Sequence, residues 1–141
     1  NELGEHIRQE GREFGTVTGR PRRCGWLDLV ACRYTALLNG VTEVGVMLLD
    51  VLSKLDEVKI CVAYEIDGKE TTEFPPFIGD LERCRPIYRT LPGWKTDLRG
   101  CRRPSDLPPA AQEYIRTIAD FLKVKVRLVS VGPARDETVE F

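Results

Sequence analysis

The chain has 141 residues, of which 42% are hydrophobic and 30% are charged. This is an ordinary composition for a globular protein large enough to bury one core. A formal net charge of −1 argues against a protein whose main role is to bind nucleic acid, because such proteins present a basic face. No apolar run approaches the roughly 18–20 residues of a membrane span, and no signal-peptide pattern opens the sequence. We therefore expect a cytoplasmic protein without nucleic-acid or membrane partners.

The five cysteines are widely spaced and form no CxxC pair, which argues against a zinc site and a thioredoxin-like motif. Free thiols in a reducing compartment are the expected state. The single histidine, His6, lies near the start of the chain and is not expected to be catalytic. The spacing of these residues predicts no metal site.

The first half of the chain predicts two helices separated by a loop. Residues 3–12 are typical of the end of a polar helix, and Gly11 loosens it. After the loop, apolar residues recur at helical spacing until Asn39-Gly40 ends the second helix. The residues of this stripe are Trp26, Leu27, Val30, Ala31, Tyr34, Leu37 and Leu38.

Two strands and a hairpin follow. Residues 44–50 are apolar until they end on a carboxylate, which favours a strand buried on both faces, as in a parallel sheet, with a helix as the alternative. Residues 58–66 alternate strictly between apolar and other residues, as in a half-buried strand. Asp67-Gly68 is a tight-turn signal, so residues 69–74 should return as the second arm of a hairpin.

The remaining residues predict one helix and one strand after a long irregular stretch. A short helix at 79–84 and an extended segment at 86–91 precede the Pro92-Gly93 turn. Residues 96–109 should be mostly loop, and Pro108 or Pro109 should begin a helix with one apolar face. Residues 126–131 then predict a buried strand. The fold class is α/β: a mixed sheet with buried, parallel-type strands, a β-hairpin and packed helices.

The loop at 15–23 is a candidate anion site. It combines glycines, which allow close approach of a ligand, with hydroxyls and guanidiniums that donate hydrogen bonds to carboxylates and phosphates. Arg20 and Arg22 lie two residues apart, which in extended backbone places them on one face. Thr16 and Thr18 share that parity. The alternative is a solvated basic loop.

Two further candidates follow apolar strands. Asp50 ends the 44–50 run, and ligands of open α/β sheets bind beyond the carboxyl ends of strands. An ionised carboxylate only accepts hydrogen bonds, so it selects a base edge with donors, such as N1–H and the amine of guanine. The alternative is a helix N-cap. At Ser130 to Pro133, a serine and a closely approaching glycine could frame a planar base with backbone groups, or the segment could form a plain turn.

Other polar clusters have simpler interpretations. The hairpin carboxylates should form a solvated face, the two tryptophans should anchor packing, and three later arginines should be surface charge with a smaller chance of meeting a partner. These residues are Glu65, Asp67, Glu70 and Glu73; Trp26 and Trp94; Arg99, Arg102 and Arg103.

Taken in order, these segments resemble adenylosuccinate synthetase. The matching segments are GTVTGRPRRCGWLDLVACRY (15–34), LNGVTEVGVMLLDVLSKLDEVKICVAYEIDG (38–68), YRTLPGW (88–94), LPPAAQEYI (107–115) and VSVGPARDET (129–138). The match is to roughly the final third of that family's protein. The resemblance implies one C-terminal segment, 1–141, of a larger, homodimeric α/β ligase, which joins IMP and L-aspartate using GTP and Mg²⁺.

The resemblance also implies residue roles. The aspartate-binding residues would be Thr16, Val17, Thr18, Gly19, Arg20, Pro21 and Arg22, with Arg20 also contacting IMP. The GTP-binding residues would be Arg22, Leu48, Leu49, Asp50, Ser130, Val131 and Gly132, in the guanine-binding elements 47–50 and 130–133. The phosphate loop, the catalytic residues and the magnesium ligands of the family would lie upstream. No catalytic residue is expected within 1–141, which should be inactive alone.

Two positions depart from the family pattern. Thr-Lys-Leu-Asp is usual where this chain has Met47 to Asp50, so Leu48 lacks the lysine charge but could pack on the base. Pro21 replaces a residue that is often basic. The alternatives are a related viral-type synthetase with altered nucleotide use, and a non-catalytic anion- or nucleic-acid-binding module.

Overall fold

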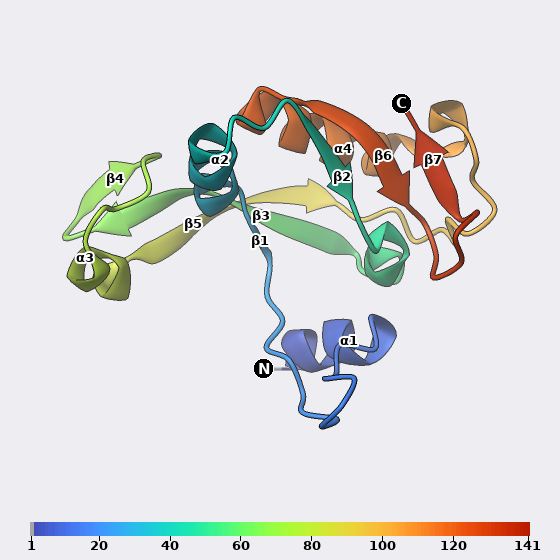
Figure 1. Cartoon of the computed structure of the whole chain (residues 1–141), viewed down its shortest axis with the longest axis horizontal. Coiled ribbons are helices and arrows are strands. Elements are labelled where there is room, and N and C mark those ends of the chain that lie inside the picture. Colours follow the sequence, from blue (N-terminus) through green and yellow to red (C-terminus); the bar gives the residue numbers. More distant parts are fainter. Residues whose placement is uncertain (1) are drawn as a thin grey trace.

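The computed structural model describes residues 2–141, which contain both helices and strands (Figure 1). The α-helices are α1 (Glu2–Glu10), α2 (Leu29–Leu38), α3 (Ile78–Arg83) and α4 (Pro109–Leu122). The strands are β1 (Leu27–Asp28), β2 (Glu43–Val46), β3 (Glu57–Ile66), β4 (Lys69–Thr71), β5 (Arg85–Pro92), β6 (Lys125–Ser130) and β7 (Thr138–Glu140). Two short 3₁₀ helices are η1 (Leu49–Leu52) and η2 (Pro104–Asp106). The predicted α/β class is confirmed.

The strands form two mixed sheets. In the first, β3 pairs with β1 in parallel and with β4 and β5 in antiparallel orientation. In the second, β6 lies between β2, which is parallel to it, and β7, which is antiparallel. The sequence predicted all of these strands except β1 and β7, which are only two and three residues long.

The capping residues explain where two of the helices begin and end. The predicted helix at Trp26 begins instead at Leu29, because the carboxylate of Asp28 accepts a hydrogen bond from the Ala31 N–H at 3.1 Å and caps the helix. Trp26 and Leu27 precede the helix and pack against the core. Helix α4 has a proline in its first turn, as predicted, and ends at Leu122, where Lys123 forms the C-cap with a left-handed φ of 54°.

The 44–50 run is not a strand buried on both faces. Strand β2 ends at Val46, and Glu43 and Gly45 are exposed because they lie on the opposite face of the strand from Val44 and Val46, which pack against the core. Leu48 then takes a left-handed conformation, φ 60°, and the chain continues as η1.

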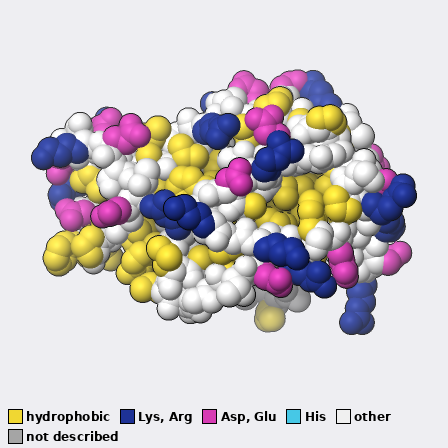
Figure 2. Space-filling model, turned by 90° about the horizontal axis from the view of Figure 1, so that it is seen from above, with side chains coloured by type: hydrophobic (Ala, Val, Ile, Leu, Met, Phe, Trp, Pro, Cys, Tyr) yellow, Lys and Arg dark blue, Asp and Glu magenta, His cyan; other side chains and the backbone are white. Residues whose placement is uncertain are grey.

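Hydrophobic side chains are exposed on the face seen from above (Figure 2). The exposed large hydrophobic residues of the chain include Leu37, Leu38 and Met47.

The hairpin of β3 and β4 turns at Asp67-Gly68, as predicted, with left-handed φ values of 50° and 78°. Its carboxylates Glu65, Asp67, Glu70 and Glu73 are exposed, as expected. The strict alternation predicted for β3 breaks at an irregularity between Cys61 and Ala63, both of which are buried.

Strand β5 is joined to the segment after η1 by a close backbone contact. The Gly93 N–H donates to the Asp56 carbonyl at 2.8 Å. A Cβ at Gly93 would lie 2.0 Å from the Leu55 carbonyl oxygen, so the glycine is required by space. The following stretch, predicted as loop, is irregular apart from η2 but contributes the buried Leu98 and Leu107 to the core.

The core lies between the sheets and α4. Its largest cluster includes Leu49, Ile60, Tyr114, Ile118 and Val129. Trp94 is buried there, and its indole N–H donates to Ser53 Oγ at 3.2 Å, in line with its predicted packing role.

The five cysteines are free thiols. Within residues 2–141, no helix is both long enough and apolar enough to cross a bilayer.

Candidate functional site

The segments around Leu48 and Ser130 are adjacent because the strands that precede them are parallel neighbours. Val46 of β2 is paired with Val129 of β6, so both strands end at the same edge of the sheet. The backbone N–H of Leu48 donates to Ser130 Oγ at 2.7 Å. The structure thus brings together the predicted elements 47–50 and 130–133, which lie 82 residues apart at this bond.

Asp50 lies in η1, and is neither a strand end nor the N-cap that sequence offered as an alternative, since Leu48 occupies the cap position. Its Oδ1 atom is buried and has no hydrogen-bond partner among the described residues. Burial raises the pKa of this carboxyl, while its own backbone N–H and Arg99 act in the opposite direction. A buried acceptor without a partner is costly unless a ligand supplies the donor.

Asp50 opens into a cavity of about 540 Å³. The cavity is bounded by the end of α1, by η1 with Leu48, by the loop after β5 and by Pro133. Leu48 presents a partly exposed aliphatic side chain there. A volume of this size is within the range of small-ligand sites.

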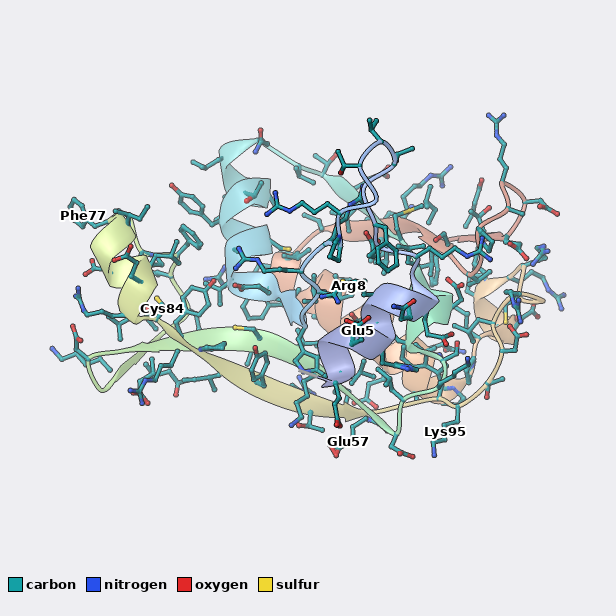
Figure 3. All side chains as sticks on the ribbon, turned by 90° about the horizontal axis from the view of Figure 1, so that it is seen from below. Glu5, Arg8, Glu57, Phe77, Cys84 and Lys95 are labelled. Atoms are coloured by element: carbon teal, nitrogen blue, oxygen red, sulfur yellow. The ribbon has the colours of Figure 1, made fainter. Side chains whose placement is uncertain are left out.

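Charged side chains surround Asp50 in this cavity. Lys54 binds Glu10 of α1 at 2.8 Å, and Arg99 binds Asp97 at 2.8 Å, which lowers the pKa of Asp97 to about 2. Lys95, labelled in Figure 3, pairs with Asp56. None of these residues was predicted as part of the site; Arg99 was expected to be surface charge, with a smaller chance of contacting a partner. Nothing in the local sequence placed Arg99 beside Asp50, because only the tertiary fold brings them together.

Gly132 is buried, and Glu137 occupies the space beside it. A Cβ on Gly132 would lie 2.3 Å from Glu137 Oε2. That oxygen accepts from the Ala134 N–H at 2.7 Å, and the Glu137 carbonyl accepts from the Val131 N–H at 2.8 Å. The turn after β6 is therefore closed by one glutamate, whose charge also contributes to the raised pKa of Asp50.

The 15–23 loop is closed at its base like a short hairpin. The Arg22 N–H donates to the Glu13 carbonyl at 3.0 Å, and the Gly15 N–H donates to the Arg20 carbonyl at 2.8 Å. Between these bonds, Phe14 and Pro21 form an antiparallel bridge. The pairing keeps Arg20 and Arg22 at positions of equal parity, as the prediction of a common face requires.

The tip of this loop differs from the prediction. Residues 16–18 form a turn, so the shared parity of Thr16 and Thr18 does not define a common face. Val17 is 97% exposed at the tip. Gly19, at φ 64°, has the left-handed conformation that closes the turn, and Thr18 Oγ1 accepts from the Arg20 N–H at 3.3 Å.

The 15–23 loop and the cavity around Asp50 are separate, but the segment that follows α1 borders both. In Figure 1, α1 and the loop lie below the two sheets, and an extended segment leads back up to β1. Residues 10–12 line the cavity, and Glu13 begins the paired base of the loop. Thr16 to Arg22 are not among the cavity residues. Within residues 2–141, no group of three or more His, Cys, Asp or Glu side chains is placed to hold a metal ion.

Comparison with known proteins gives a consistent match over almost the whole chain. The family model for adenylosuccinate synthetase matches residues 1–139. The adenylosuccinate synthetase of Staphylococcus saprophyticus is 51% identical over 138 residues, covering 98% of this chain and 32% of that protein. That of Coccidioides posadasii is 49% identical over 140 residues, covering 99% and 33% respectively.

A solved structure also matches. Fully ligated adenylosuccinate synthetase from Plasmodium falciparum superposes with a TM-score of 0.95 at 34% identity, covering 100% of this chain and 34% of that one. The chain thus spans about one third of the length of the curated relatives it matches. The family model, the sequence relatives and the solved fold agree, and the chain belongs to the adenylosuccinate synthetase family.

Proposed function

We propose that the chain is the C-terminal, aspartate- and guanine-binding segment of a GTP-dependent ligase that joins IMP and L-aspartate to form adenylosuccinate. In this reaction GTP phosphorylates the 6-oxygen of IMP, and the amine of aspartate then displaces the phosphate. The proposal includes a homodimeric, cytoplasmic parent protein without nucleic-acid or membrane partners. Family membership supports the reaction class, and the geometry around Asp50 supports the assignment of the guanine site.

The observation that carries the guanine assignment is the buried Oδ1 of Asp50, which has no partner within residues 2–141. In the proposed complex the Asp50 carboxylate accepts hydrogen bonds from N1–H and the 2-amine of guanine, both of which are donors. Leu48 packs on the base. Leu49, Ser130, Val131 and Gly132 are buried and do not line the cavity themselves, so in the proposal they support the wall that Leu48 and Pro133 form.

The proposed aspartate site is the 15–23 loop. Thr16 to Pro21 surround the substrate, and the Arg20 side chain binds aspartate together with the ribose of IMP. Arg22 lies between aspartate and the GTP phosphates. Guanidinium groups suit this role because their planar donors match carboxylate and phosphate oxygens.

Magnesium accompanies GTP in the proposal, where it neutralises phosphate charge. The described residues supply no cluster of metal-ligating side chains, so no step is assigned to the ion here. Its ligands, and the catalytic groups, are assigned to the part of the longer relatives that this chain does not match. The 141 residues alone are therefore expected to be inactive.

A chimera tests the proposal. Residues 1–141 replace the matching segment of the Staphylococcus saprophyticus relative, which is 51% identical, and adenylosuccinate formation is measured with GTP and with ATP. We expect turnover with GTP, little with ATP, and none from the isolated 141 residues. A folded chimera that is inactive, or that uses ATP equally well, contradicts the proposed function. Turnover by the isolated chain contradicts the assignment of the catalytic groups elsewhere.

A further inference from the structure

Arg22 is held in place by three hydrogen bonds with Arg8 and Glu13, and its carbonyl also accepts a longer one from the Cys24 thiol at 3.8 Å. Its backbone N–H donates to the Glu13 carbonyl at 3.0 Å, and its own carbonyl accepts from Arg8 Nε at 2.7 Å. Its guanidinium Nη1 donates to Glu13 Oε2 at 2.8 Å. Backbone and side chain are therefore both fixed before any ligand binds.

Arg20, two residues earlier, is held only through its backbone. Its N–H reaches Thr18 Oγ1 at 3.3 Å, and its carbonyl accepts from Gly15 at 2.8 Å. No hydrogen bond or ion pair of its guanidinium occurs among the described residues. Within the loop, the guanidinium of Arg22 is therefore held by a carboxylate, whereas that of Arg20 is not. We call the Arg22–Glu13 ion pair the clamp.

The clamp leaves part of Arg22 available. Glu13 is the more buried partner, with 24% of its side chain exposed against 59% for Arg22. It engages only Nη1, so Nε and Nη2 have no partner within residues 2–141. A guanidinium has five N–H donors, so the free edge can still bind a carboxylate or phosphate in the bidentate manner typical of arginine.

The support for Glu13 and Arg22 comes from α1. Arg8, which holds the Arg22 carbonyl, is itself paired with Glu5 on the same helix (Figure 3). Glu13 follows the turn after the end of α1, and its N–H donates to the Arg8 carbonyl at 2.9 Å. Arg8 therefore bonds to both members of the pair, and α1 fixes them in one frame.

We propose that Glu13 is a positioning residue for Arg22, orienting the guanidinium so that its free edge meets the anionic groups of the substrates. The inference rests on the proposed function and names a residue that contacts no substrate itself. Ordering a flexible side chain before binding lowers the entropic cost of association by an amount of order 0.5–1.5 kcal/mol. This corresponds to about a two- to tenfold effect on an apparent affinity.

The test uses the chimera with the variants Glu13→Gln and Glu13→Asp. Glutamine keeps the size of the side chain but removes its charge, and we expect the KM for aspartate to rise by about two- to tenfold. The KM for IMP should stay within about twofold. The Glu13→Asp variant keeps the charge on a shorter side chain, so its KM for the substrate aspartate should rise less than that of Glu13→Gln. The control is Asp67→Asn, which removes another exposed carboxylate paired with an arginine, Arg83, in the distant hairpin.

The outcomes separate the two claims. An active chimera in which Glu13→Gln keeps the original KM for aspartate overturns the positioning role and leaves the proposed function intact. Equal losses for Glu13→Gln and Asp67→Asn overturn it as well. If Glu13→Gln does not fold, Glu13→Asp decides: an unchanged KM for aspartate refutes the role, and a raised one supports it. An original chimera without turnover overturns both the inference and the proposed function.

Discussion

Replacing Asp50 by asparagine should weaken GTP binding without destabilising the protein. Asparagine has nearly the same shape, but one carboxylate oxygen becomes an NH₂ group, which donates where guanine also donates. Because Oδ1 is buried without a partner among the described residues, the substitution breaks no internal hydrogen bond at that atom. The effect on binding is therefore separable from an effect on folding.

The magnitude follows from the lost bond. A hydrogen bond to a charged group contributes about 1.5–3 kcal/mol, so the loss of one weakens the Kd for GTP by roughly 10- to 200-fold. Stability should change in the opposite direction. Burial raises the pKa of Asp50, which means that the ionised form is disfavoured in the folded state at neutral pH. Asparagine removes this charge, so the melting temperature without nucleotide should stay equal or rise.

Both quantities are measured on the chimera, by calorimetric titration with GTP and by thermal denaturation without it. The control is Asp56→Asn, because Asp56 is a surface carboxylate, 79% exposed and paired with Lys95. An unchanged Kd for GTP in Asp50→Asn would falsify the guanine-reading role. A weaker Kd together with a clearly lower melting temperature would show instead that Asp50 supports the local fold.

Two further outcomes are expected of the same chimera. Because burial, reinforced by the nearby charge of Glu137, raises the pKa of Asp50, GTP binding should weaken as pH falls from neutral toward that pKa; a pH dependence retained in Asp50→Asn would contradict this origin. Gly132→Ala should push the Glu137 carboxylate away and cost about 1 kcal/mol of unfolding free energy through the lost bond to the Ala134 N–H. Gly25→Ala, where a Cβ meets nothing within 4 Å, is the control in urea denaturation, and equal effects of the two would refute the contact.

Local signals predicted much of the fold. The Asp67-Gly68 turn was predictable because its two left-handed residues fit a two-residue hairpin. The start of α4 was predictable because proline suits a first turn. Strand β7 was missed because Thr138–Glu140 has too few residues for a pattern and is defined by its pairing with β6. The η1 helix was hidden within an apolar run because the left-handed Leu48 that ends the extended segment has no sequence signature.

Some residues of the candidate site could likewise be predicted from local sequence, and others could not. Asp50 and Ser130 could be singled out because each ends an apolar run, and the parallel pairing of β2 with β6 does bring the segments around Leu48 and Ser130 to one edge. Arg99 could not, since its place beside Asp50 depends on the path of the loop after Trp94, in which only Leu98 is buried before Arg99. The clamp of Arg22 by Glu13 was also out of reach. It depends on a cross-strand pairing that the open-loop interpretation of residues 15–23 did not include.

The close contact at Gly93 holds together two segments that continue into the walls of the cavity around Asp50. Leu55 comes shortly after η1, which forms one wall, and Gly93 comes just before Lys95 and Arg99 on another. With the Leu55 oxygen only 2.0 Å from where a Cβ would sit, any other residue at 93 would force these two walls apart. One methyl group added outside the cavity would therefore displace two of the segments that line it.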